Sequence, residues 1–192
     1  MIKGIVEPAN VFGYLTEGVP KEYVDEQFES WDDITFSMYQ AKKGVNDKPD
    51  FDYTDFGLLF SQNDQSEYIV LIDQFSHSYK FGTAIHPHIH YIQTSNTTPK
   101  FILQYRWYDN GAVVPAFTTI ETTGNALPYI GGTMLQILNF PSIVSTVSGL
   151  SSWLDLKLFR KTGNGVTGDI LVKTFDIHYQ KDSNGSNSEY IK

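Results

Sequence analysis

The stretch Ile85-His86-Pro87-His88-Ile89-His90-Tyr91 decides the fold class, because apolar and polar side chains alternate along it. Successive side chains of a β-strand point to opposite faces of a sheet, so the stretch predicts a strand with one apolar face. The other face carries three of the five histidines of the chain, His86, His88 and His90, hereafter the histidine row. A row of imidazoles needs water, a polar partner or a metal ion. What the histidine row contacts is therefore the central question.

The same period of two extends through most of the chain on both sides of the histidine row. Residues 101–108 and 153–160 both alternate apolar with more polar side chains. About eight to ten such runs, separated by turn residues, predict an all-β protein and specifically an antiparallel β-sandwich of the jelly-roll type. The glycines at 163 and 165 predict a hairpin between the last two strands, at 153–160 and 168–180.

Three segments of different composition suggest the domain organisation. Residues 31–182 form the expected β-sandwich domain. Residues 1–30 are expected to be an N-terminal arm that attaches the domain to another protein, with a short helix that begins near Pro20. Residues 183–192 are a polar C-terminal tail.

Composition excludes several classes of function. The chain has 192 residues, a net charge of −8 and no cysteine, which excludes disulfides and thiolate metal sites. Its Lys and Arg residues form no cluster larger than a pair, so no nucleic-acid partner is expected. No apolar stretch approaches the length of a transmembrane helix and no signal peptide is readable, so no membrane insertion is expected.

A metalloenzyme of the cupin type is the closest catalytic interpretation of the histidine row. In that pattern a glycine-rich strand carries His-x-His, a glutamate follows, and a second motif supplies another histidine. Gly82 precedes the row here, but no acid lies between Tyr91 and Arg106. Gln93 is the nearby polar substitute and His178 the only downstream histidine. This interpretation predicts one metal ion per chain inside the barrel, close to Gln93 or His178.

Symmetry offers a second interpretation, in which three copies of the chain meet on a threefold axis. Each copy contributes the same residues to such an axis. A pair of histidines from each chain would supply six nitrogen ligands to iron, nickel or zinc. The candidate metal ligands are then His86, His88 and His90. Because Pro87 cannot donate a hydrogen bond to a neighbouring strand, His88 and His90 are the preferred pair.

The simplest interpretation is a polar surface without a metal ion. Gln104 and Arg106 on a neighbouring strand, or water, would then satisfy the imidazoles, and His77 and His178 would be ordinary structural or surface residues. No nucleophile elbow or phosphate-binding glycine loop is present, so no catalytic residue is assigned and no enzymatic activity is expected. Trp107 and the tyrosines beside it could form a sugar-binding platform, although strand packing explains them more simply.

Two regions resemble virion structural proteins of tailed bacteriophages. The first is His86-Pro-His-Ile-His-Tyr91 followed by Phe101-Ile-Leu-Gln-Tyr-Arg-Trp-Tyr108. The second is Phe175-Asp-Ile-His-Tyr179 with Gly185-Ser186 and the C-terminal Glu189-Tyr-Ile-Lys192. The family pattern has Trp where this chain has Tyr91. The resemblance implies a trimeric β-sandwich of the tail-fibre, head-fibre or collar type.

The expected function is therefore that of a non-enzymatic structural component of a phage particle, located in the virion and assembled in the host cytoplasm. It would be a short fibre head, a collar or capsid decoration, or a tail adaptor. The expected partners are two further copies of the chain, in a homotrimer with the histidine row at the subunit interface, and other virion proteins bound through the N-terminal arm. The alternative is a carbohydrate- or receptor-binding module that recognises a host surface glycan, with no receptor-binding residue assigned.

Overall fold

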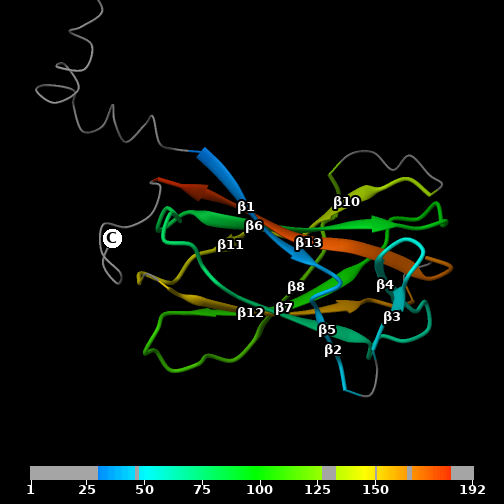
Figure 1. Cartoon of the computed structure of the whole chain (residues 1–192), viewed down its shortest axis with the longest axis horizontal. Helices are drawn as coiled ribbons and strands as arrows, with labels where there is room; N and C mark the ends of the chain where they lie inside the picture. The colour runs from blue at the N-terminus through cyan, green and yellow to red at the C-terminus, as the bar shows by residue number, and fades with distance from the viewer. Residues whose placement is uncertain (1–29, 46–47, 127–132, 150, 164–165, 183–192) are drawn as a thin grey trace, which may run out of the picture.

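The computed structural model describes residues 30–45, 48–126, 133–149, 151–163 and 166–182. Over these residues the protein is all-β, and two antiparallel sheets stack as a β-sandwich, which appears as two layers in Figure 1. The fold class predicted from alternation is therefore confirmed. The helix expected near Pro20 and the polar tail at 183–192 lie outside the described residues. Nowhere in the described ranges is there a helix that could cross a membrane.

The larger sheet has eight strands in the order β3-β4-β13-β6-β10-β9, with β1 also paired to β13 and β11 also paired to β6. Its strands are β1 (Ser30–Ser37), β3 (Asp50–Asp52), β4 (Gly57–Phe60), β6 (Ala84–Ile92), β9 (Gly124–Asn125), β10 (Gln136–Asn139), β11 (Ile143–Val144) and β13 (Ile170–Lys181).

The smaller sheet has five strands in the order β2-β5-β12-β7-β8. Its strands are β2 (Lys42–Lys43), β5 (Tyr68–Gln74), β7 (Phe101–Tyr108), β8 (Thr118–Glu121) and β12 (Trp153–Arg160). The row β4-β13-β6-β10 in one sheet is stacked on the row β5-β12-β7-β8 in the other. This is the strand order of a jelly roll.

The hydrophobic core lies between the two sheets and uses one face of each strand. From the larger sheet, Ile89 and Phe175 are fully buried, and from the smaller sheet Leu103 and Leu156 are fully buried as well. Each of these residues is an apolar member of an alternating run, so the alternation directs apolar side chains inward and polar ones outward. The histidine row, which alternates with Ile85, Ile89 and Tyr91, therefore belongs to the outer face of the larger sheet.

On one of its sides, the central strand β6 pairs with two short strands that are separated by a break. β10 pairs with it from His88 to Tyr91 and β11 pairs with it at Ala84 and Ile85, while β13 pairs continuously along its other side over His86–His90. Phe140, in the break between β10 and β11, donates its N–H to the carbonyl of Pro87 at 3.0 Å. In an extended strand the nitrogen and carbonyl of one residue point to the same side. Pro87 thus turns its donor-free nitrogen toward the break, as its chemistry requires.

Two expectations about connectivity need correction. The predicted hairpin at Gly163 is wrong, because β12 and β13 belong to opposite sheets and the connection crosses the sandwich. Both sides of β12 are already occupied, by β5 and by β7. The described residues also form thirteen strands rather than eight to ten. The additional ones are two or three residues long, too short to show a period in the sequence.

Candidate functional site

The histidine row lies in a polar grid on the outer face of the larger sheet, formed by β6, β13 and β1. In register, His86 is opposite His178, His88 is opposite Asp176, and His90 is opposite Thr174. β1 continues the same rows, because Asp33 pairs with His178 and Thr35 pairs with Asp176. Since side chains at paired positions share one face of a sheet, three histidines of β6 and the Asp and His of β13 gather on a single surface.

Asp176 is the centre of the closest cluster in this grid. Its Oδ2 lies 2.9 Å from Nε2 of His90 and 3.7 Å from Nε2 of His88. The hydroxyl of Thr174 also donates to Oδ2, at 2.9 Å. In the described part of the chain, His88, His90 and Asp176 are the group of potential metal ligands whose ligand atoms all lie within 4.8 Å of one another.

The carboxylate of Asp176 is buried although it lies on the outer face of the sheet. The residue is 7% exposed. Its second oxygen, Oδ1, is buried and accepts no hydrogen bond from any residue that the structure describes. A buried carboxylate oxygen without a partner is energetically costly. The cluster therefore has unused capacity to bind a proton donor or a cation.

The imidazole of His88 is held in one orientation by a contact with the backbone of its own strand. Its Nδ1 lies 3.4 Å from the carbonyl oxygen of His86, so Nδ1 carries the proton and donates it there. Burial lowers the pKa of His88, and the neighbouring His178 lowers it further. The ring of His178 lies 4.5 Å from the ring of His88, edge to face. Nε2 of His88 is consequently directed toward Asp176, whose Oδ2 lies 3.7 Å away.

A groove of about 520 Å³ opens beside this cluster, at the end of the grid where β10 gives way to β11. Trp31 of β1 forms one wall; it is 56% exposed, and its ring lies 5.2 Å from that of His86. Nδ1 of His86 is hydrogen-bonded to the hydroxyl of Ser142 at 2.9 Å. The described residues that line the groove are Trp31, His86, Pro87, His88, Thr123, Ala126, Ile137, Asn139, Phe140, Ser142 and His178.

The predicted partners of the histidine row are wrong. Gln104 and Arg106 lie on β7 in the other sheet, where Nε of Arg106 pairs with Oδ2 of Asp155 at 2.7 Å. The histidines instead contact β13, whose position beside β6 depends on chain segments far apart in the sequence. His178 is a half-exposed surface residue with structural contacts, as expected, since it adjoins His88 and pairs with Asp33 at 3.1 Å. His77 belongs to none of the strands β6, β13 and β1, and its Nε2 is hydrogen-bonded to the hydroxyl of Ser151 at 2.8 Å.

The cupin interpretation does not match the geometry. It requires the histidines to project into the interior of the barrel, but Ile89 and Tyr91 occupy the interior and the histidine row projects outward. Gln93 donates to the carbonyl oxygens of Ser95 and Thr97 and thereby closes a turn. The metal prediction for a threefold axis through His86, His88 and His90 stays a prediction. In the structure the potential ligand atoms of His88 and His90 do lie close together, and the third residue beside them is Asp176 rather than His86.

Trp107 belongs to strand packing, the simpler of the two interpretations, and not to a sugar-binding platform. Trp107 is buried and packs on Phe75 at 4.7 Å between ring centroids, and its indole N–H donates to Ser152. The exposed tryptophan of the groove is Trp31, which sequence reasoning did not single out. A usable signal existed, because Trp31 begins an alternating run and lies on the side of β1 that carries Asp33 and Thr35.

Comparisons with known proteins give a fold-level likeness and no family. No family model matches the chain, and no curated protein matches it either. Among solved structures it is similar to the mannan-recognising carbohydrate-binding module TmCBM27, at 9% identity and a TM-score of 0.40 over 79% of this chain and 98% of that one. It is also similar to the CBM22-1–GH10 modules of Clostridium thermocellum xylanase 10B, solved with xylohexaose, at 10% identity and a TM-score of 0.38 over 82% and 27%.

A third likeness is to the enzymatically active domain of bacteriophage CBA120 tailspike protein 4, at 15% identity and a TM-score of 0.33. It covers 78% of this chain and 19% of that one. The chain thus spans less than a third of the xylanase and tailspike chains. At these identities and TM-scores the likenesses say nothing about function, and any functional conclusion depends on the groove and the grid themselves.

Proposed function

We propose that this protein is a non-enzymatic binding module that recognises a glycan through the groove between β1 and β10. The observation that supports the proposal best is the exposed indole of Trp31 at the wall of a concave, partly polar groove. An exposed aromatic ring in a concave site usually has a binding role, because water solvates its face poorly. The C–H face of a sugar ring packs on such an indole.

The remaining groove residues supply the directional contacts that a sugar requires. Asn139 offers an amide, Thr123 and Ser142 offer hydroxyls, and His86 and His178 offer imidazole nitrogens. Such groups both donate and accept hydrogen bonds, as sugar hydroxyls do. A groove of about 520 Å³ is also within the usual size range of small-ligand sites. Apolar stacking on one wall and mixed hydrogen bonding elsewhere fit a neutral polyhydroxylated ligand.

The test is a glycan array probed with the labelled full chain, followed by calorimetry with the best ligand. We expect Trp31→Ala to weaken binding by at least about tenfold, or ~1.4 kcal/mol. Trp153→Ala is the matched control, because Trp153 is also exposed but lies on β12 in the other sheet. The control variant is expected to bind as the unchanged protein does. Absence of binding to every glycan, or equal weakening by both substitutions, would refute the proposal.

The setting that we propose for this module is a tailed-phage particle, as a homotrimeric virion component. The support is the sequence resemblance around His86–Tyr91, Phe101–Tyr108 and Phe175–Tyr179 described above. Light scattering on the full chain tests the assembly, since one chain has a mass of 21.8 kDa. A mass three times larger is expected, and a stable monomer would argue against the homotrimer without affecting the glycan-binding proposal.

A further inference from the structure

We propose that His88, His90 and Asp176 bind one divalent transition-metal ion within a single chain. Two imidazoles and one carboxylate are a ligand set used by zinc and by non-haem iron(II). All three residues come from the adjacent strands β6 and β13, which hold them on one rigid surface. This site goes beyond glycan recognition and does not depend on it.

The distances in the cluster suit an ion that binds all three residues. Zinc lies about 2.0 to 2.2 Å from imidazole nitrogen and carboxylate oxygen, so neighbouring ligand atoms of one ion are about 3 to 3.5 Å apart. Oδ2 of Asp176 lies 2.9 Å from Nε2 of His90 and 3.7 Å from Nε2 of His88. The widest separation in the group is no more than 4.8 Å. A small convergence of the two rings therefore completes the site, with the ion between Oδ2 of Asp176 and the two Nε2 atoms.

The buried oxygen of Asp176 is an independent indication of a missing partner. The Asp176 side chain has only 10% of its surface exposed, and Oδ1 accepts no hydrogen bond from the described residues. In the absence of a cation, Oδ1 bears a desolvation cost that no contact among the described residues offsets. A divalent ion bound to the carboxylate supplies the compensating charge.

The surroundings orient the ligands as the outer shell of a metal site does. A metal-binding histidine typically donates its second ring N–H to a carbonyl or carboxylate. His88 does so, since Nδ1 faces the carbonyl oxygen of His86 and Nε2 is left on the side of Asp176. Thr174 donates its hydroxyl to the carboxylate of Asp176 and fixes it between the two rings. These contacts hold the ligand atoms in place before an ion arrives.

This site differs from metal binding on a threefold axis in its ligands and its stoichiometry. Asp176 replaces His86, whose ring instead contacts Trp31 and Ser142. A single-chain site binds one ion per chain, whereas an axial site binds one ion per three chains. His88 also lines the groove, so the ion lies next to the proposed glycan site.

The experiment is a calorimetric titration of Zn²⁺ into the untagged full chain after treatment with EDTA, with Co²⁺ absorption as a second measurement. We expect about one equivalent of Zn²⁺ per chain and visible d–d bands with Co²⁺. Asp176→Asn and His90→Gln should each weaken Zn²⁺ binding by more than about tenfold. His77→Gln is the control for surface histidines and should leave the affinity unchanged, because His77 lies outside the grid.

Three results would overturn the inference. The first is that the chain does not bind Zn²⁺. The second is that Asp176→Asn and His90→Gln both leave the Zn²⁺ affinity unchanged. The third is a stoichiometry of one-third of a Zn²⁺ ion per chain that is lost in His86→Gln. Circular dichroism shows whether each variant folds. If Asp176→Asn does not fold, His90→Gln decides the question, because His90 is a quarter exposed and tolerates substitution more readily. Glycan binding by the EDTA-treated chain shows separately whether the glycan proposal holds.

Discussion

Asp176 lies directly opposite His88 in the antiparallel pairing of β13 with β6, and its Oδ2 also lies 2.9 Å from Nε2 of His90. The acid that is absent from the neighbourhood of the histidines in the sequence thus comes from the last strand of the fold. A second histidine–aspartate pair, His178 with Asp33, lies one row away on the same face. The two pairs have similar lengths, 2.9 and 3.1 Å, but very different exposure.

Because Asp176 is buried and Asp33 is exposed, we expect their replacement by alanine to change the free energy of unfolding by different amounts. Asp176→Ala in EDTA-treated protein should lower the free energy of unfolding by about 1 to 2 kcal/mol, because the partly buried hydroxyl of Thr174 loses its acceptor and His90 loses its ion-pair partner. Asp33→Ala should lower it by less than about 0.5 kcal/mol. Urea denaturation of the three proteins measures both effects. The side chains of His178 and Asp33 are 48% and 53% exposed, which makes this pair the matched control. Equal losses in the two variants would contradict the argument.

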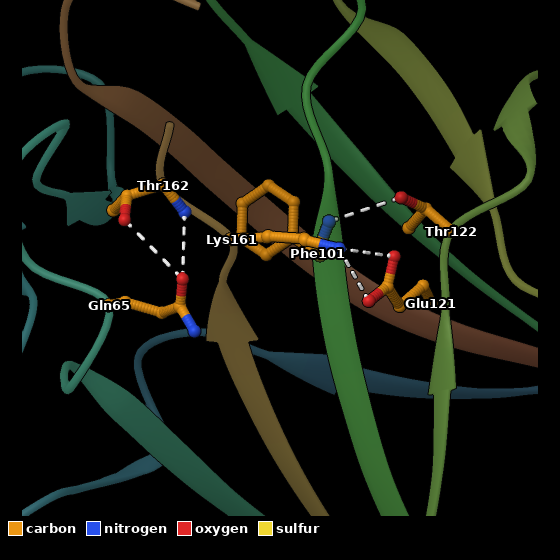
Figure 2. A network of polar contacts seen from close by, with 6 residues as sticks. All are labelled: Gln65, Phe101, Glu121, Thr122, Lys161 and Thr162. Carbon is orange, nitrogen blue, oxygen red and sulfur yellow. Dashed lines mark hydrogen bonds and ion pairs between the residues drawn. The ribbon is translucent and has the colours of Figure 1, made fainter. Parts of the chain in front are cut away.

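A second prediction concerns the edge of the smaller sheet shown in Figure 2. The hydroxyl of Thr122 accepts a hydrogen bond from the backbone N–H of Phe101 at 3.1 Å, in a buried position. Thr122→Val keeps the shape of the side chain and removes the acceptor. The buried N–H then has no partner, and we expect the free energy of unfolding to fall by about 1 to 3 kcal/mol. Thermal and urea denaturation measure the loss.

The ion pair beside Thr122 is the internal comparison for that prediction. Nζ of Lys161 lies 2.7 Å and 2.8 Å from the two carboxylate oxygens of Glu121. Both side chains are well exposed, 38% for Lys161 and 43% for Glu121. Solvent screens such a pair, so Lys161→Met should cost no more than about 0.5 kcal/mol. A larger loss in Lys161→Met than in Thr122→Val would reverse the expected ranking.

Local alternation of apolar and polar residues predicts where the long strands lie, but not which strands pair with one another. The strands at 84–92, 101–108 and 153–160 follow from period two, because the direction of a side chain depends only on its neighbours in the strand. Which strands become neighbours depends on segments far apart, so the crossing from β12 to β13 between sheets has no local signal. The φ of 73° at Gly163 marks a turn, but does not tell whether that turn joins strands of one sheet or of two.

The candidate site shows the same division between local and long-range information. The outward direction of His86, His88 and His90 follows from alternation with buried Ile89 and Tyr91. Their partners do not, since Asp176 reaches them only through the register of β13 on β6. The alternation of Thr174, Asp176 and His178 within one run is a signal of a second polar row. Only the pairing of the two strands shows that the rows share one face.

Glu67 provides a prediction about pH dependence. Burial raises the pKa of Glu67 above its usual value of 4.5, and the neighbouring carboxylates of Asp64, Asp169 and Asp50 raise it further. The backbone N–H of Ser61 donates to this carboxylate and opposes the shift in part. A carboxyl whose pKa is higher in the folded than in the unfolded state binds protons more tightly when folded. Its contribution is therefore favourable below about pH 4.5 and is lost as the pH rises through the higher folded value.

Glu67→Gln should consequently stabilise the protein at pH 7 and lose that advantage near pH 4. The amide oxygen of Gln still accepts from Ser61, while the repulsion from the surrounding acids disappears. The nearby Arg160 guanidinium favours the ionised form of Glu67 and limits the gain, as solvent screening does. We expect a gain of about 0.5 kcal/mol at pH 7. Urea titrations of both proteins at the two pH values measure it, and a destabilised variant at pH 7 would show that the Arg160 interaction dominates.

Tryptophan fluorescence gives a final test of the groove, because the three tryptophans differ in environment. Trp107 is buried in the core, Trp153 is exposed on the smaller sheet, and Trp31 is exposed at the groove. A glycan that packs on Trp31 removes water from its indole, so saturation with ligand should shift the emission to shorter wavelength. Trp31→Phe should abolish the shift while Trp153→Phe retains it. A shift that survives in Trp31→Phe would place the ligand elsewhere on the protein, since no other tryptophan lines the groove among its described residues.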